Sequence, residues 1–336
     1  MTGVAALMLS PLAMAEPVID ITGLVEVEAV SAEDYSGINT NDITLATAWL
    51  SFDTEVNERV SAHVAFLYEE DATDLGLDEG TLTVGLSRSM SLTAGKMYVP
   101  FGRFDTLMVS DPLTLAMGET VESVLMLSGE RNGLYGSAYL FNGDSDEASE
   151  VAKGENTGIS GGVNLGYTKE DVYDVGISYI SNIADSDALQ ELDDGNAAKP
   201  VHTHGVVKSS VPGMSAYIYF DFGRFTLLGE HVSAIETFSN GDLDGTVNNK
   251  EQPSAKNLEV GVGLTSDLTF AVAYQSTREA QFIGLPEMVL SSTLAYEVAE
   301  GATIAAELAN MKDYGVNDGG TGENATSVTV QLAVEF

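Results

Sequence analysis

The sequence lacks cysteine altogether, and it lacks any apolar run of 18 or more residues after position 15. The first absence excludes disulfide bonds and fits a protein that crosses an oxidising compartment without needing them. The second excludes a membrane-spanning helix, which needs about 20 apolar residues. Whatever the compartment, stability has to come from packing and hydrogen bonds.

Basic residues are scarce. There are 14 Lys and Arg against 51 Asp and Glu, for a formal net charge of −37. This balance excludes a general nucleic-acid binder, because binding phosphates needs clustered bases. It also argues against docking on anionic lipid through a basic patch. An acidic soluble protein remains compatible with composition alone.

The N-terminus predicts export. Residues 3–15 are apolar and end in Ala13-Met14-Ala15, an A-x-A cleavage pattern. No base precedes this stretch, so we expect the basic region of a signal peptide, and the true start, to lie a few residues upstream. We therefore predict a truncated signal peptide at 1–15 and one domain over 16–336.

After this segment the chain alternates apolar and polar residues with a period of two, which is typical of half-buried strands. A soluble β-sandwich would show the same period. The alternating segments are 19–29, 60–69, 163–168, 172–180, 215–222, 257–264, 268–276, 288–297 and 302–309.

The connections between these segments are sorted by length, which a sandwich would not require. Short turns alternate with long polar stretches, as the periplasmic turns and extracellular loops of outer-membrane barrels do. A hairpin repeat needs roughly 40 residues, so the chain holds about sixteen strands. The predicted fold is an all-β, antiparallel transmembrane barrel. The predicted turns are 54–59, 87–90, 129–133, 168–171, 222–224, 265–267 and 298–302, and the predicted loops are 31–41, 69–79, 100–120, 142–157, 184–212, 238–254, 277–286 and 313–325.

The C-terminal residues "ATSVTVQLAVEF" form one more alternating strand, whose apolar face carries Val328, Val330, Leu332, Val334 and Phe336. We interpret it as the strand that closes the barrel by pairing with the first, because hydrocarbon leaves no backbone group unpaired. A terminal strand ending in Phe336 also resembles the sorting signal that the barrel assembly machinery reads. Phe336 is the predicted assembly signal.

Several stretches carry a family resemblance: "PFGRFDT" (100–106), "SDPLTLAMGET" (110–120), "YLFNGD" (139–144), "SYISNIADSD" (178–187) and "FTLLGEHVSA" (225–234). In this order they resemble the LbtU-type siderophore porin family of outer-membrane barrels. The resemblance implies a barrel of about sixteen strands that takes part in the uptake of an iron–siderophore complex. No space for an N-terminal plug domain is visible, so transport would be diffusive or substrate-selective.

Residues 100–120 are too long for a turn and more apolar than the other loops. Burial inside the lumen would remove the apolar side chains of this loop from water and would narrow the pore. A lid across the barrel mouth is the alternative. The predicted constriction and solute-contacting residues are Lys96, Arg103, Asp105, Asp111 and Glu119.

Strand alternation assigns further acids to the lumen, because a charge on the lipid face is costly. With few bases on the same face, the channel is predicted to prefer cations. An anionic ferric complex would have to pass close to Lys96 and Arg103. The predicted lumen acids are Glu26, Glu28, Asp174, Asp221, Glu230, Glu259, Glu297 and Glu307.

The predicted loops contain acidic groups that could bind divalent cations and bridge lipopolysaccharide phosphates, although solvated loops carry the same composition. "DLDG" (242–245) is a fragment of a calcium-loop pattern without its spaced Glu. These acids are Glu69, Glu70, Asp71, Asp74, Asp78 and Glu79; Asp144, Asp146, Glu147 and Glu150; Asp185, Asp187, Glu191, Asp193 and Asp194; Asp242 and Asp244.

Nothing predicts catalysis or a resident cofactor. His63 lies beside Ser61 on an alternating strand but has no visible third partner, and "HTH" (202–204) has no further metal ligand nearby. The sequence therefore favours a porin-like channel for small solutes, with a ferric siderophore as one candidate cargo. A non-transporting structural barrel or adhesin is the alternative. Homotrimerisation is left open.

Overall fold

The computed structural model describes residues 18–143, 145–147, 158–169, 172–190, 206–239, 242–243 and 250–336. The predicted signal peptide lies outside these ranges. So do His202, His204 and several of the predicted loop acids, namely Asp144, Glu150, Glu191, Asp193, Asp194 and Asp244.

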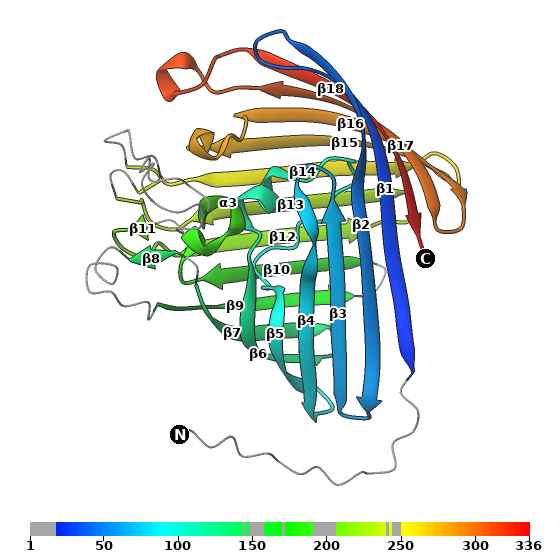
Figure 1. Cartoon of the computed structure of the whole chain (residues 1–336), viewed down its shortest axis with the longest axis vertical. Coiled ribbons are helices and arrows are strands. Elements are labelled where there is room, and N and C mark those ends of the chain that lie inside the picture. Colours follow the sequence, from blue (N-terminus) through cyan, green and yellow to red (C-terminus); the bar gives the residue numbers. More distant parts are fainter. Residues whose placement is uncertain are drawn as a thin grey trace.

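Sixteen antiparallel strands form a closed barrel (Figure 1). Each pairs with its neighbours along the chain, and β18 pairs with β1 to close the sheet. This confirms the predicted fold and strand number. The barrel strands are β1 (Ile19–Glu33), β2 (Asn39–Asn57), β3 (Val60–Glu69), β4 (Thr73–Ser87), β5 (Met90–Tyr98), β6 (Val121–Arg131), β7 (Leu134–Asn142), β9 (Ile159–Lys169), β10 (Tyr173–Ile180), β12 (Gly213–Asp221), β13 (Phe225–Ala234), β14 (Ser254–Gly263), β15 (Leu268–Arg278), β16 (Met288–Ala299), β17 (Ala302–Lys312) and β18 (Asn324–Glu335).

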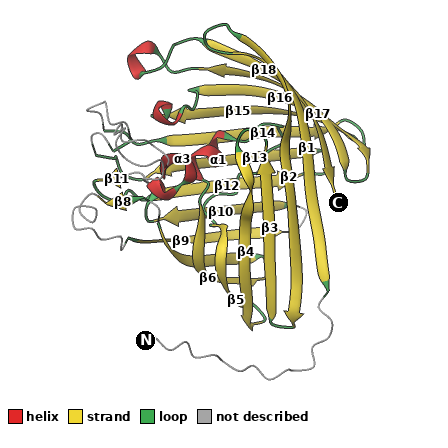
Figure 2. Cartoon of the chain, in the orientation of Figure 1, coloured by secondary structure: helices red, strands yellow, loops and turns green. Residues whose placement is uncertain are grey.

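The remaining elements are short and belong to the connections. The two-residue strands β8 (Asp146–Glu147) and β11 (Val206–Val207) pair in parallel outside the barrel sheet. The helices in Figure 2 are of one or two turns. They are α1 (Leu113–Gly118), η1 (Ile183–Asp185), α3 (Asp187–Gln190), η2 (Gln281–Ile283) and η3 (Val316–Asp318).

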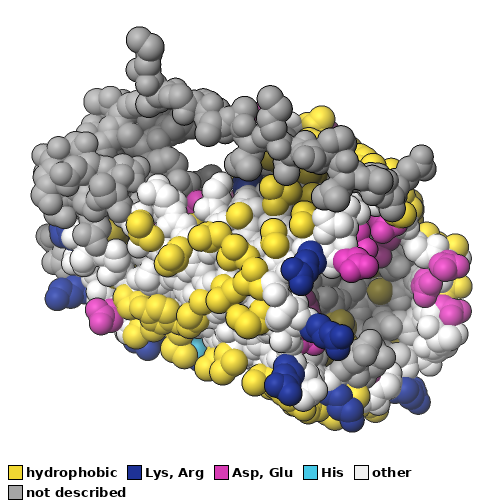
Figure 3. Space-filling model, turned by 90° about the horizontal axis from the view of Figure 1, so that it is seen from below, with side chains coloured by type: hydrophobic (Ala, Val, Ile, Leu, Met, Phe, Trp, Pro, Cys, Tyr) yellow, Lys and Arg dark blue, Asp and Glu magenta, His cyan; other side chains and the backbone are white. Residues whose placement is uncertain are grey.

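The alternation of the sequence becomes an apolar outside and a mostly polar inside. On β14, for example, Asn257 and Glu259 are buried inside while Leu258 and Val260 are exposed outside. Figure 3 shows such apolar side chains as a broad band across the outer face, with Lys and Arg gathered at one end of the band beside a hollow. A continuous apolar band around a closed sheet is the surface that a bilayer requires.

The predicted sorting of connections is present, with two exceptions. At one end β2 ends at Asn57 and β3 begins at Val60, and the β6–β7 turn has the positive φ angles of an Asn-Gly hairpin, 55° at Asn132 and 82° at Gly133. The opposite end carries the long connections. We call these the turn end and the loop end, and in bacterial barrels the turn end is periplasmic.

The predictions of long loops at 31–41 and 69–79 are wrong. β1 and β2 continue to a hairpin at 34–38, and β3 and β4 to one at 70–72. β1, β2 and β4, with 15, 19 and 15 residues, are longer than a membrane crossing needs, and the outer end of β2 carries polar side chains on both faces. A strand end that is polar on both faces shows no apolar–polar alternation, so the sequence predicts a loop there.

The seam between β1 and β18 is closed by Phe336 and Gly23. Their backbones exchange two hydrogen bonds, of 2.8 and 3.0 Å. The Phe336 ring covers Gly23 so closely that a Cβ atom there would lie 2.6 Å from Cζ of the ring. The ring thus fills the space left by the missing side chain on the outer face of the seam.

We expect Phe336→Ala to reduce the amount of folded barrel in the outer membrane while leaving export unchanged, because it exposes the backbone of the seam. Heat-modifiable gel mobility measures the folded fraction. Phe225→Ala, at an exposed position on the outer face of β13, is the control. Equal amounts of folded protein for Phe336→Ala and the unmodified chain would remove any special role of Phe336 in assembly.

Candidate functional site

The connection between β5 and β6 folds into the barrel, as predicted, and does not form a lid. Its apolar side chains leave water by packing on the inner wall: Phe101 and Met117 are fully buried. They belong to a cluster with Val124 of β6 and Val232 of β13, both of which face inward. We call residues 99–120 the inserted loop.

Three interior glutamates hold the inserted loop against the wall. Glu230 of β13 accepts hydrogen bonds from the backbone N–H groups of Arg103 (2.7 Å) and Phe104 (3.0 Å). Glu259 of β14 accepts one from Leu107 N–H (2.6 Å). Hydrogen bonds to a charged acceptor are roughly twice as strong as neutral ones.

The third glutamate, Glu307 of β17, accepts hydrogen bonds from the N–H groups of Val109 (2.5 Å) and Ser110 (2.9 Å) and from Ser110 Oγ (2.7 Å). The amide oxygen of Gln275 on β15 accepts one from Leu113 N–H (2.7 Å). Side chains from β13, β14, β15 and β17 thus supply partners for a loop that has few backbone partners of its own. Glu230, Glu259 and Glu307 are 9%, 0% and 4% exposed.

Arg103 projects from the inserted loop into a cluster of acidic and aromatic groups. Its guanidinium contacts the carboxylates of Asp105 and Asp174 and lies 4.9 Å from the ring centroid of Tyr219. Tyr135 also donates to Asp174, at 2.7 Å. Two carboxylates therefore compensate this base, so Arg103 adds no net positive charge to the lumen.

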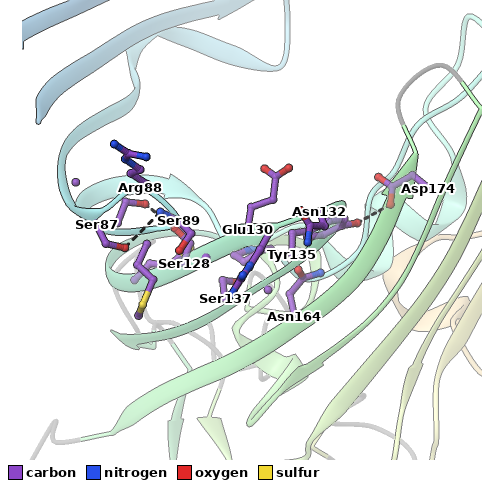
Figure 4. A pocket seen from close by; sticks show the side chains of 18 of the residues that line it. Ser87, Arg88, Ser89, Ser128, Glu130, Asn132, Tyr135, Ser137, Asn164 and Asp174 are labelled. Atoms are coloured by element: carbon purple, nitrogen blue, oxygen red, sulfur yellow. Dashed lines mark hydrogen bonds between the residues drawn. The ribbon is translucent and has the colours of Figure 1, made fainter. Parts of the chain in front are cut away.

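A cavity of about 960 Å³ lies inside the barrel between the inserted loop and the turn end. Figure 4 shows its hydroxyl and amide lining, with the Tyr135–Asp174 hydrogen bond at one side. Ser91, Ser128, Ser137 and Asn164 occupy directly paired positions on β5, β6, β7 and β9. This row offers hydrogen-bonding groups, while Arg88, Glu130 and Arg131 bring charge to the part of the lining nearest the turn end.

A second set of connections fills the loop end beside the inserted loop. η1 and α3 follow β10, and α3 contacts α1. Ile183, Leu189, Val211 and Phe238 from these connections are buried in the same apolar cluster as Phe101. These connections therefore narrow the lumen at the loop end.

The opposite wall, formed by β1 to β4, carries carboxylates. Glu28 hydrogen-bonds Gln331 (2.9 Å), and Asp78 accepts hydrogen bonds from Tyr98 (3.0 Å) and Trp49 (3.3 Å). Glu79 also belongs to this wall. We call this surface the acidic wall. His63 lies near Glu79, but no Lys or Arg of the described residues pairs with these carboxylates, so they make the potential beside the inserted loop negative.

Glu119, at the end of the inserted loop, titrates in the physiological range. Burial and the nearby carboxylate of Asp187 raise the pKa of Glu119 to about 7. The carboxylates of Asp111, Asp78 and Glu69 act in the same direction. Its charge therefore depends on external pH.

The structure corrects the predicted position of Lys96 and shows what covers three of the predicted lumen acids. Lys96 pairs with Gly80 and Ser123 on the face shared with outward-facing Leu82 and Leu125, so it lies outside the barrel, and its Nζ donates to the Leu77 carbonyl (3.0 Å). Glu230, Glu259 and Glu307 do face inward, but they lie beneath the inserted loop instead of lining water.

The other predicted residues lie as follows. Glu26 and Glu28 lie inside on β1, and Asp111 is exposed at the inserted loop. Asp221 and Glu297 lie at the turn end, where Asp221 accepts from Gly223 N–H (2.5 Å). Asp53, an interior residue of β2, was missed. The available signal was its place next to Phe52, whose apolar side chain takes the opposite face of the strand.

His63 has carboxylates at both ring nitrogens. Nδ1 lies 2.8 Å from Asp53 Oδ1, and Nε2 lies 3.9 Å from Glu79 Oε1. A hydrolytic triad needs a hydroxyl nucleophile at the nitrogen that faces away from the aspartate. Glu79 occupies that side.

Within the described ranges, no group of three or more His, Cys, Asp or Glu side chains is arranged to hold a metal ion. Among the same residues, no helix has the length and apolar character of a membrane span. The divalent cations suggested by the acidic loops stay a prediction.

Comparison with known sequences finds distant relatives over nearly the whole chain. A UPF0422 protein of Legionella pneumophila (strain Lens) is 27% identical over 364 aligned residues, covering 95% of this chain and 67% of the relative. A UPF0422 protein of Coxiella burnetii is 24% identical, covering 94% of this chain and 68% of the relative. No family model matches the chain.

Solved structures share the fold. The anion-selective porin of Comamonas acidovorans superposes with a TM-score of 0.66 at 12% identity, covering 96% of this chain and 100% of that one. OmpF of Salmonella typhi, in complex with daunomycin, gives 0.67 at 13%, covering 95% and 97%. The outer-membrane channel DcaP of Acinetobacter baumannii gives 0.64 at 12%, covering 95% and 97%. The fold is that of the outer-membrane β-barrels of Gram-negative bacteria.

Proposed function

We propose that this barrel is a passive outer-membrane channel for small hydrophilic solutes. The observation that carries the proposal is the inserted loop, which Glu230, Glu259 and Glu307 hold against β13, β14 and β17, with a cavity of about 960 Å³ between the loop and the turn end. A loop held in this way narrows the passage without relying on a separate domain. The aperture would lie between the inserted loop and the acidic wall.

A ferric siderophore is a narrower proposal, and it rests on the sequence resemblance. The interior adds one condition: Arg103 is compensated by two carboxylates, and Lys96 lies on the outer face. Arg88 and Arg131 also line the cavity, but at the turn end. An anionic complex would therefore find no uncompensated base at the inserted loop. We therefore propose a neutral or cationic complex as the cargo. Growth on defined iron–siderophore complexes of different charge, with and without this protein, tests this choice.

A structural, non-conducting barrel is the second candidate. The apolar cluster at the loop end favours it, because Ile183, Leu189, Val211 and Phe238 occupy part of the mouth. We also propose that the barrel forms a homotrimer. OmpT of Vibrio cholerae, which has been solved in a trimer form, shares the fold with a TM-score of 0.57 at 13% identity.

Purified, folded protein in a planar bilayer decides between channel and structural barrel. We expect discrete single-channel steps in 1 M KCl, because the inserted loop is held against β13, β14 and β17 and the opposite wall carries polar side chains. A heat-denatured sample of the same preparation is the control. Folded barrels that insert without conducting would contradict the channel and favour the structural role.

A further inference from the structure

Three basic side chains, those of His231, Lys256 and Lys312, lie in one cross-strand row on the outer face of β13 to β17, near the loop end, with Ser276 and Met288 between Lys256 and Lys312. Strand pairing places each member directly beside the next. Arg278 lies two residues beyond the β15 member on the same face. The row runs, from β13 to β17, through His231, Lys256, Ser276, Met288 and Lys312. We call it, together with Arg278, the basic row.

The basic row faces away from the lumen. The neighbours of Lys256 in sequence, Ala255 and Asn257, are buried inside the barrel, so Lys256 points outward. The next outward residues toward the turn end include Leu258, Tyr274 and Leu290, all of which are exposed. The basic row therefore marks the edge of the apolar band, where hydrocarbon gives way to headgroups.

Neighbouring carboxylates compensate only part of the positive charge of the basic row. Lys312 Nζ lies 2.5 Å from Glu287, and Arg278 Nε lies 3.4 Å from Glu279. His231 Nδ1 lies 3.0 Å from the Ala255 carbonyl. Lys256 makes no hydrogen bond or ion pair within the described part of the chain. The protein has a net charge of −37. An uncompensated lysine beside an arginine and a histidine on its lipid face therefore favours the binding of an external anion.

We propose that the basic row binds the phosphate of an outer-leaflet lipid of the lipid A class. Lys256 and Arg278 would contact the phosphate, and the acyl chains would lie along Leu258, Tyr274 and Leu290. A phosphate ester complements these bases by charge-assisted hydrogen bonds. A lipid suits the site because the apolar band begins at the next outward-facing residues toward the turn end. This contact is direct and independent of the acidic loops and of solute transport.

Native mass spectrometry of the folded, detergent-solubilised protein tests the proposal with bisphosphorylated lipid A as the probe. Lys256→Gln with Arg278→Gln is expected to weaken lipid A binding at least about tenfold, because each base near a membrane surface contributes on the order of 1 kcal/mol. The matched control, Arg59→Gln with Arg88→Gln, removes the same charge at the turn end and should leave binding unchanged.

Each alternative gives a different result. Equal loss in both double variants would mean general electrostatics and would overturn the proposal. So would undiminished binding of dephosphorylated lipid A, or displacement of lipid A by inorganic phosphate at equal concentration, which would indicate a site for free phosphate. Where the double variant folds poorly, Lys256→Gln and Lys256→Arg are compared. The arginine should retain the affinity that the glutamine loses, and equal affinities would overturn the proposal.

Discussion

Replacing Glu259 and Glu307 together by alanine is expected to raise single-channel conductance about twofold or more while the barrel still folds. The two carboxylates accept hydrogen bonds from three backbone N–H groups and two hydroxyls of the inserted loop. Each hydrogen bond to a charged group contributes about 1.5–3 kcal/mol. Without them, residues 106–110 lose their attachment to β14 and β17 and can leave the narrowest part of the lumen.

Glu28→Ala is the matched control, since Glu28 is also an interior glutamate but hydrogen-bonds Gln331 of β18. Recording in 1 M KCl suppresses the effect of the lost charges themselves, because screening then acts within about 3 Å. If the double variant folds and conducts as the unmodified barrel does, the inserted loop does not limit the current.

At low salt the open channel is expected to prefer K⁺ over Cl⁻ by about tenfold. A water path with low-dielectric walls and carboxylates on one side concentrates counter-ions by a factor of this order or more. Glu26, Glu28 and Asp111 supply the charge, and Arg103 is already paired with Asp105 and Asp174. The reversal potential across a KCl gradient measures the preference, which should fall as salt rises.

Anion preference at low salt would contradict the acidic wall as the surface of the water path. The anion-selective porin of Comamonas acidovorans shows that this fold is compatible with the opposite preference. Ion selectivity therefore depends on the side chains that line the water path and not on the barrel fold itself.

The cation preference should also increase with pH between about 6 and 8. Glu119 has a pKa raised to about 7, so it is mostly neutral below that value and charged above it. Reversal potentials at the two pH values measure the change. Glu119→Gln should give the smaller, pH-independent preference, and an unchanged pH response in this variant would assign the titration to another group.

Much of the architecture could be predicted because alternation and turn chemistry are local. The period of two gave the strands, and the apolar character of 100–120 predicted its insertion. What covers Glu230, Glu259 and Glu307 could not be predicted, because their partners in the inserted loop lie more than 100 residues away. Alternation specifies a face, but not whether water or protein lies on it.

Lys96 shows a different kind of error. It was assigned to the lumen because it stands near the inserted loop in sequence, whereas the period of two places it with Leu92 and Ala94 on the outer face. A lysine is tolerated there because its long side chain reaches a backbone carbonyl toward the loop end. The alternation rule was the better guide.

The seam has a consequence for how the barrel is made. Its strands lie far apart in the sequence: Gln331 and Glu28, which meet across it, are 303 residues apart. A contact of such long range makes folding slow, since a large loss of chain entropy precedes any gain. Until β18 arrives, β1 presents an unpaired edge that invites aggregation. The period between synthesis and closure is therefore when this chain most depends on chaperones, and variants that weaken the seam should be degraded before insertion rather than lost from the membrane afterwards.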